Sequence, residues 1–245
     1  ILPPRDLLKQ HYLINCHYSP LTDLRAMQKS GSNDMPYDLY VVTDEKLGKG
    51  RTHKQIAQEA VNGGADVIQL RDKEMSGRGL FITACEIRDI TRIAGALFIV
   101  NDRIDIAIAS GADGVHLGQD DLPLSVARQL APWDFISGIA VGSVTEAVNA
   151  EAGGADYVAV SPVFGTGTKQ DAGPGHGTAL VKAVRQNISI PVLCIGGITK
   201  ENVREVLLSG ADGIAVVSAV ISSDDIANAS RELKSLIRHY KQIRT

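Results

Sequence analysis

The chain has 245 residues, enough for one large domain or two small ones, and single α/β barrels commonly have about this length. Its formal net charge of −3 lacks the basic excess of a nucleic-acid-binding surface, and no apolar run approaches the roughly 18 residues that span a bilayer. Three widely spaced cysteines, Cys16, Cys85 and Cys194, form no metal-ligand pattern. We therefore expect a reduced, cytoplasmic globular protein without nucleic acid or membrane partners. The sequence leaves open whether it forms a homo-oligomer.

The first 36 residues differ in pattern from the remainder of the chain. They contain scattered prolines and no sustained hydrophobic period, and they lack the apolar core of a secretory signal. We expect residues 1–36 to form a short N-terminal extension, poorly structured or appended, and residues 37–245 to form one catalytic domain.

From Asp38 onward, short apolar segments alternate eight times with amphipathic helical segments. The short segments are almost wholly apolar, as expected for strands buried on both faces. The predicted strands are Leu39–Thr43, Val67–Leu70, Leu97–Val100, Gly114–Leu117, Phe135–Val141, Tyr157–Val160, Val192–Ile195 and Gly213–Val217. In the second helical segment, the expected buried face is Leu80, Ala84, Ile87 and Ala94.

The tripeptide Gly-Ala-Asp occurs four times, each time directly before an even-numbered predicted strand. The copies are residues 64–66, 111–113, 154–156 and 210–212. A motif at every second strand indicates a βαβα unit repeated four times, which closes naturally into a (β/α)8 TIM barrel. An open parallel sheet is the alternative. We predict an α/β protein with a single TIM barrel, whose functional residues lie at the carboxyl ends of the strands.

Polar side chains follow the second predicted strand. Alternation places Gln69, Arg71 and Lys73 on one side. An arginine fork and a lysine point charge at this end of a barrel could hold a pyrophosphate. The alternative is a surface salt-bridge cluster with Asp72 and Glu74.

Acids follow the third and fourth predicted strands. Asn101 and Asp102 come after one, and Asp121 after the next. Parallel strands bring these residues to the same rim, where two hard oxygen ligands suit a Mg²⁺ ion that also holds phosphate oxygens. Helix capping is the alternative for each residue. We expect His116, inside the fourth strand, to be a packed histidine rather than a ligand.

Loops that suit phosphate follow the last three strands. Ser161–Lys169 is rich in glycine and hydroxyl groups and could bind phosphate or close as a lid. Gly196 and Gly197 follow the seventh strand and Ser218 follows the eighth; in many barrels these two loops bind a phosphate through backbone N–H groups. A plain tight turn is the alternative. The residues therefore favour transfer chemistry in which metal and cations stabilise the charge of a leaving group.

From about Tyr37 to the last helix, the sequence resembles the thiamine-phosphate synthases. The matching motifs are Leu39–Asp44, Gln69–Lys73, Val100–Arg103, Gly114–Asp121, Ser161–Lys169, Ile195–Ile198 and Val217–Ala219. The resemblance implies a TIM-barrel transferase of thiamine biosynthesis. Its substrates would be 4-amino-2-methyl-5-hydroxymethylpyrimidine pyrophosphate and 4-methyl-5-(2-phosphoethyl)thiazole, and its products thiamine phosphate and pyrophosphate. The reaction would be dissociative: pyrophosphate leaves first, and the thiazole nitrogen attacks the resulting carbocation.

The same resemblance implies a role for each matching residue. Those implied to bind the pyrimidine pyrophosphate are Gln69, Arg71, Lys73, Asn101 and Lys169. Those implied to bind the thiazole phosphate are Thr166, Thr168, Gly197, Val217 and Ser218. The implied cofactor is Mg²⁺, with Asp102 and Asp121 as its ligands. The implied catalytic residues, which would assist the departure of pyrophosphate, are Arg71, Lys73 and Lys169.

One position departs from the family pattern. After the fifth strand the family usually has Gly-Val-Ser, whereas this chain has Gly138-Ile139-Ala140. One lost hydrogen bond to a charged group is worth roughly 1.5–3 kcal/mol. Ser143, three residues further on, is a candidate to replace the missing hydroxyl.

Two other functions compete with condensation. A thiazole tautomerase is an isomerase that makes no carbon–nitrogen bond and would not need the pyrophosphate side of the site. The third hypothesis is a non-catalytic ligand-binding relative, which the replacement of the family's serine by Ala140 suggests.

Overall fold

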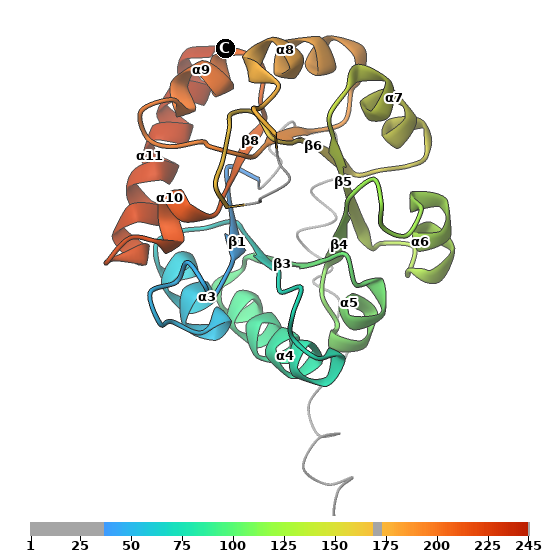
Figure 1. Cartoon of the computed structure of the whole chain (residues 1–245), viewed down its shortest axis with the longest axis vertical. Helices are drawn as coiled ribbons and strands as arrows, with labels where there is room; N and C mark the ends of the chain where they lie inside the picture. Colours follow the sequence, from blue (N-terminus) through green and yellow to red (C-terminus); the bar gives the residue numbers. More distant parts are fainter. Residues whose placement is uncertain (1–36, 169–172, 245) are drawn as a thin grey trace, which may run out of the picture. The chain divides into compact units, whose positions relative to one another are not determined.

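The computed structural model describes residues 37–168 and 173–244, and within them eight parallel strands close into a barrel (Figure 1). Each strand pairs with its neighbours in sequence, and β8 pairs with β1. The strands are β1 (Leu39–Thr43), β2 (Val67–Leu70), β3 (Leu97–Asn101), β4 (Gly114–Leu117), β5 (Ile136–Val141), β6 (Tyr157–Val160), β7 (Val192–Cys194) and β8 (Gly213–Val216). The TIM barrel is confirmed, and the open sheet is wrong. Four predicted strands match at both ends, and the other four differ by one residue at one end.

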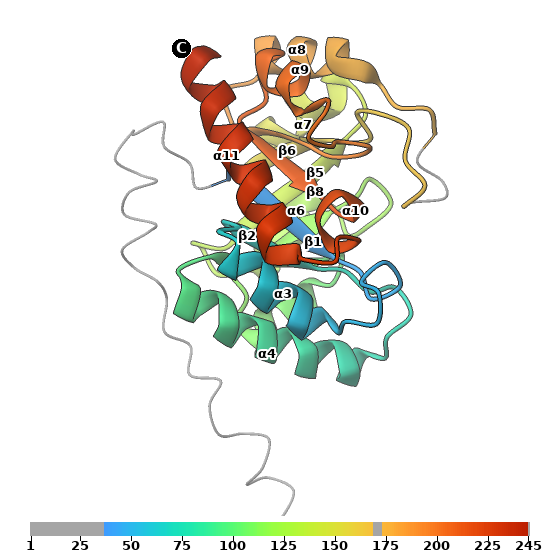
Figure 2. The ribbon, with the colours of Figure 1, turned by 90° about the vertical axis from the view of Figure 1, so that its left-hand side faces the viewer.

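Helices surround the strands in a ring, which Figure 1 shows from one end of the barrel. They are α3 (His53–Asn62), α4 (Gly77–Ala94), α5 (Ile104–Ser110), α6 (Leu124–Leu130), α7 (Val144–Ala152), α8 (Gly177–Asn187), α9 (Val203–Leu208), α10 (Ser218–Ile221) and α11 (Ile226–Arg244). Figure 2 shows α3 lying between α4 and α11. In α4, Leu80, Ala84 and Ile87 are buried as predicted, but Ala94 is exposed because the last turn of this long helix is left uncovered.

Strand side chains alternate between two apolar clusters. Tyr40 and Val42 belong to a small cluster inside the barrel, whereas Leu39 and Val41 belong to the larger cluster between strands and helices. Successive side chains of a strand point to opposite faces, so this alternation follows from the pleat. The barrel interior is therefore filled with side chains rather than open as a pore.

The four aspartates of the Gly-Ala-Asp repeats make equivalent contacts. Each carboxylate accepts a hydrogen bond from a backbone N–H near the start of the preceding strand, and each aspartate N–H donates to the carbonyl of that same residue. The pairs, with the carboxylate distance, are Asp66–Leu39 (2.9 Å), Asp113–Phe98 (2.8 Å), Asp156–Ser137 (2.7 Å) and Asp212–Val192 (2.9 Å). The glycine of every repeat has a positive φ, between 72° and 112°, as expected for a residue that ends a helix.

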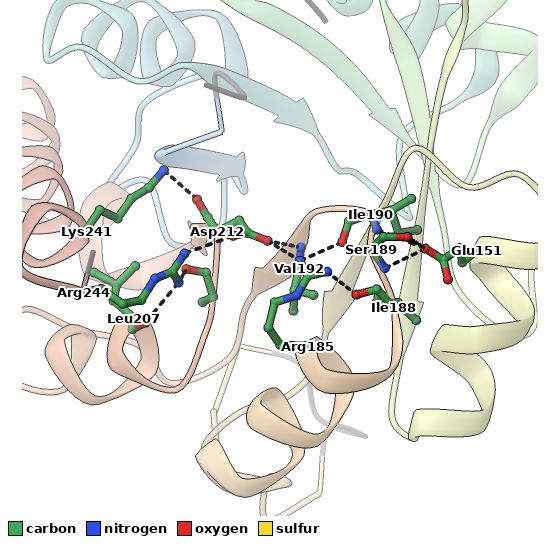
Figure 3. A network of polar contacts seen from close by, with 11 residues as sticks. Glu151, Arg185, Ile188, Ser189, Ile190, Val192, Leu207, Asp212, Lys241 and Arg244 are labelled. Atoms are coloured by element: carbon green, nitrogen blue, oxygen red, sulfur yellow. Dashed lines mark hydrogen bonds and ion pairs between the residues drawn. The ribbon is translucent and has the colours of Figure 1, made fainter. Parts of the chain in front are cut away.

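Asp212 also ties two helices to the barrel (Figure 3). Its carboxylate pairs with Arg185 of α8 at 2.9 Å and with Arg244 of α11 at 3.2 Å. Its carbonyl accepts a hydrogen bond from Nζ of Lys241 at 3.0 Å. This one residue, which directly precedes β8, therefore joins β7, α8 and α11 at the amino-terminal end of the barrel.

Two predictions fall outside the described residues. They are the extension at residues 1–36 and the role of Lys169. In the part of the chain that the structure describes, no helix is long and apolar enough to cross a membrane.

We expect Asp212→Ala to lower the free energy of unfolding by roughly 1–3 kcal/mol, because the Val192 N–H loses its side-chain acceptor and the Arg185 guanidinium loses its carboxylate partner. Urea denaturation measures the change. Asp224→Ala is the matched control, since that side chain is 96% exposed and pairs only with Lys49 among the described residues. The free energy of unfolding of this control should stay within the error of the measurement, because exposed ion pairs contribute little. Equal losses in the two variants would contradict the structural role of Asp212.

Candidate active site

A pocket opens at the carboxyl-terminal end of the barrel, lined by residues from the ends of the strands and the loops after them. It brings together every predicted site residue that the structure describes. These are Gln69, Arg71, Lys73, Asn101, Asp102, Asp121, Thr166, Thr168, Gly197, Val217 and Ser218.

The floor of this pocket carries four hydrogen-bonded side chains that reach into the barrel. Nε2 of Gln69 donates to the hydroxyl of Tyr40 at 2.7 Å, and the hydroxyls of Tyr40 and Tyr157 lie 3.1 Å apart. The Tyr157 hydroxyl is 3.0 Å from Nδ1 of His116, and the two rings stack. His116 is thus packed, as expected, and burial lowers its pKa to about 4, so the ring is neutral near pH 7. The sequence interpretation did not include Tyr40 and Tyr157 among the site residues. Their hydroxyl groups, in strands that are otherwise apolar, could have indicated a polar contact inside the barrel.

Gly138 of β5 makes room for this floor. A Cβ atom at this position would lie 2.0 Å from Cζ of Tyr157. No side chain larger than hydrogen fits there unless Tyr157 moves. The glycine is therefore required for the position of the Tyr157 ring.

Asp102 and Asp121 face each other at the rim. The pKa of Asp102 is raised, first by burial and then by contact with the Asp121 carboxylate, while Lys73 opposes the shift from 3.4 Å. One oxygen of Asp121 accepts the N–H of Gly118 at 2.7 Å, which holds the loop after β4. Two carboxylates in contact repel each other until a cation lies between them.

Neither acid caps a helix. The N-cap residue of α5 is Arg103 and that of α6 is Pro123, and neither helix has a side-chain cap. Asp102 has a φ of 61°, unusual for a residue other than glycine, and its N–H donates to the carbonyl of His116 at 2.9 Å. The capping alternative is therefore wrong, and the backbone of Asp102 is held in its conformation by β4.

The acid pair fits a magnesium ion. Among the described residues, no group of three or more His, Cys, Asp or Glu side chains could hold a metal alone. Mg²⁺ is commonly held by one or two carboxylates and completes its coordination with water and substrate phosphate oxygens. Two aspartates that line one pocket with the cations Arg71 and Lys73 match that pattern.

Arg71 and Lys73, in the β2–α4 loop, lie near acids other than their sequence neighbours Asp72 and Glu74. Asp72 accepts hydrogen bonds from Nε2 of His53 and from two backbone N–H groups of its own loop. Glu74 pairs with Lys46. Arg71 instead lies 3.8 Å from Asp44, and Lys73 lies beside Asp102. The predicted alternative, a surface cluster with Asp72 and Glu74, is wrong.

The paired glycines after β7 allow the loop after β6 to lie close to them. Gly196 and Gly197 have φ angles of 102° and 63°. A Cβ atom on Gly196 would lie 2.5 Å from Cβ of Pro162, and one on Gly197 would lie 2.7 Å from the carbonyl oxygen of Gly165. The loop after β6, which carries Thr166, therefore packs directly against the loop after β7.

Ala140 lines the pocket at the end of β5, where the family pattern has a serine. Ser143 does not replace the hydroxyl there, because its side chain caps α7 by accepting the N–H of Glu146 at 3.1 Å. Ser143 is also absent from the pocket lining. Asp120, next to Asp121 in the sequence, is exposed and outside the lining.

Known proteins resemble this chain along most of its length. A family model described as thiamine monophosphate synthase matches residues 39–220. A thiamine-phosphate synthase of Methanoculleus marisnigri is 59% identical over 203 residues, which cover 83% of this chain and 96% of that protein. A thiamine-phosphate synthase of Methanospirillum hungatei is 57% identical over 205 residues, which cover 84% and 100%.

A solved structure agrees with the sequence matches. Thiamine phosphate pyrophosphorylase from Pyrococcus furiosus superimposes with a TM-score of 0.78 at 41% identity, covering 84% of this chain and 97% of that one. The matched region includes all eight strands and the pocket at their carboxyl ends. The chain belongs to the thiamine monophosphate synthase family.

Proposed function

We propose that this protein condenses hydroxymethylpyrimidine pyrophosphate with thiazole phosphate to form thiamine phosphate and pyrophosphate. The observation that carries the proposal is the composition of one pocket. It joins the acid pair Asp102 and Asp121, the cations Arg71 and Lys73, and the glycine loop at Gly197. The relatives named for making thiamine phosphate, at 59% and 57% identity, support the same reaction.

The reaction demands little proton transfer from the protein. The bond between the pyrimidine methylene carbon and a pyrophosphate oxygen breaks, and the thiazole nitrogen forms a bond to the same carbon. The nitrogen uses its lone pair and loses no proton, so no general base is needed. Negative charge grows on the departing pyrophosphate, and Arg71 and Lys73 are placed to stabilise it. Lys169 is proposed to act with them.

Magnesium would neutralise the same leaving group when bound. Asp102 and Asp121 would hold it, because their carboxylates lie in contact and a cation between them would offset their repulsion. Asn101 lies on the same rim and is proposed, together with Gln69, to contact the pyrimidine pyrophosphate.

The thiazole phosphate is assigned to the opposite side of the pocket. Backbone N–H groups of Gly197, Val217 and Ser218 would bind its phosphate, as the loops after β7 and β8 do in many barrels. Thr166 and Thr168 line the same side from the loop after β6. The two substrates would thus meet over the centre of the barrel.

The competing functions are less well supported. A tautomerase would not need the cations and the acid pair, yet they line the pocket. A ligand-binding relative would be favoured by Ala140, but one missing hydroxyl removes none of the charged groups proposed to neutralise pyrophosphate.

We also propose that residues 37–245 form the catalytic domain and that residues 1–36 are an appended segment. The match to the M. marisnigri protein covers 83% of this chain and 96% of that one, which supports this division.

The direct test mixes both substrates with Mg²⁺ and follows thiamine phosphate and pyrophosphate by chromatography. We expect both products in equal amounts, and neither when one substrate is left out. Interconversion of thiazole isomers without coupling would favour the tautomerase. Tight binding of both substrates without product would favour the binding protein.

We expect Asp102→Asn to abolish the effect of Mg²⁺ on thermal stability when pyrophosphate is present. For the unaltered protein, Mg²⁺ at ten times its dissociation constant should add about 1.4 kcal/mol to the free energy of unfolding. Without metal, the variant should be at least as stable as the unaltered protein, because it loses the repulsion with Asp121. Differential scanning calorimetry measures both effects.

Asp120→Asn is the matched control, since Asp120 is an exposed acid beside Asp121 that does not line the pocket. It should respond to Mg²⁺ as the unaltered protein does. If Asp102→Asn keeps the full response as well, the metal assignment is wrong.

A further inference from the structure

The four polar side chains under the pocket form one continuous path, which we name the polar relay: Gln69, Tyr40, Tyr157 and His116. Its members come from β2, β1, β6 and β4, so the path crosses the barrel interior. The two tyrosines and Gln69 are each at least 96% buried. The relay is thus closed to bulk water except where it meets the pocket.

Counting donors gives the relay a direction. The Tyr40 oxygen accepts from Nε2 of Gln69, so the single Tyr40 proton is left for the oxygen of Tyr157. The Tyr157 proton in turn goes to Nδ1 of His116, which must then be an acceptor. Every bond is made when the imidazole is neutral and carries its proton on Nε2.

This direction goes with one orientation of the Gln69 amide. Nε2 is held by Tyr40 at 2.7 Å, and Oε1 is left as the acceptor that faces the pocket lined by Gln69. Turning the amide over would place Oε1 against Tyr40 and would require every proton of the relay to reverse. The orientation of the Gln69 amide and the tautomer of His116 are therefore set together, through the two tyrosine hydroxyls.

We propose that Tyr40, Tyr157 and His116 are positioning residues that hold the Gln69 amide with Oε1 towards the pyrimidine ring, so that the site selects an amino-bearing ring over an oxo-bearing one. This inference rests on the proposed function, because it assumes that the pyrimidine binds over Gln69. A carbonyl oxygen accepts from an exocyclic amino group and repels an oxo group. The relay thus acts on the choice of substrate rather than on the breaking of bonds.

Packing inside the barrel holds the aromatic rings of the polar relay in place. Gly138 leaves the space that the Tyr157 ring occupies, since a Cβ there would lie 2.3 Å from the Tyr157 hydroxyl. Tyr157 also contacts the Tyr40 ring edge-on, with centroids 6.2 Å apart, and stacks on His116 with an interplanar angle of 13°. These contacts hold the rings in place when a hydroxyl is removed, so a tyrosine-to-phenylalanine change tests the hydrogen bonds alone.

The test compares Tyr157→Phe and Tyr40→Phe with the unaltered protein in steady-state coupling assays. We expect the KM for the pyrimidine pyrophosphate to rise about tenfold, the size of effect expected from one buried hydrogen bond. The KM for the thiazole phosphate should not change. The preference in kcat/KM for the amino substrate over its 4-oxo analogue should fall by a similar factor. Tyr240→Phe, on the outer helix α11, is the control for loss of a tyrosine hydroxyl and should leave all values unchanged.

A double-mutant cycle separates positioning from general loosening of the barrel. If Tyr157 acts through Gln69, Tyr157→Phe should have little further effect in a Gln69→Ala background. If Tyr157→Phe raises the KM for the pyrimidine pyrophosphate by the same factor with Gln69 present and with Gln69→Ala, the proposal is overturned. An unchanged preference for the amino over the 4-oxo substrate in the single variants would also overturn it. Should Tyr157→Phe fail to fold, Tyr40→Phe supplies the same cycle from the other side of the relay.

Calorimetric binding of the pyrimidine pyrophosphate and of its 4-oxo analogue repeats the comparison without turnover. A protein that binds the amino compound but forms no thiamine phosphate would contradict the proposed function alone. Unchanged binding in the tyrosine variants would contradict the relay alone. Binding of neither compound to the unaltered protein would contradict both.

Discussion

The rest of the structure depends on the pair of hydrogen bonds that joins each repeated aspartate to the strand before it. The four contacts lie at the amino-terminal end of the barrel, and each fixes the register of one odd strand against the next even one. Register decides which side chains point inward, because a shift of one residue would turn Gln69 and Tyr40 out of the barrel. These structural contacts therefore lie at one end of the barrel, and the pocket lies at the other.

At that other end, two acids lie in contact with each other and with one cation. Burial and Asp121 both raise the pKa of Asp102, and Lys73 compensates only in part. The φ of Asp102 is likewise unusual for its residue type. A cation and a pyrophosphate between these groups would satisfy the acids and the cations together, so the site gains most when both are bound.

Much of this could be predicted from the sequence. Apolar runs and the Gly-Ala-Asp period indicated the strands and the barrel, because buried parallel strands have a strong local pattern. The residues that line the pocket could be predicted from their place after strand ends. Contacts across the barrel could not be predicted: Tyr40 and Tyr157 are 117 residues apart, and no local pattern pairs them. The helical period placed Ala94 on the buried face of α4, but it does not show where neighbouring elements stop covering that face. Nearness in sequence made Ser143 a candidate to replace the missing hydroxyl, but it does not show that this side chain caps α7.

The central claim is that one pocket holds the pyrophosphate with its metal on one side and the monophosphate on the other. A crystal structure with thiamine phosphate, pyrophosphate and Mn²⁺ in place of Mg²⁺ tests it most directly. We predict an anomalous peak for the metal between Asp102 and Asp121, pyrophosphate oxygens on the metal and near Arg71, and the thiamine phosphate group against the backbone of Gly197 and Ser218. A metal bound away from the acid pair, or the monophosphate group on the Arg71 side, would contradict the account.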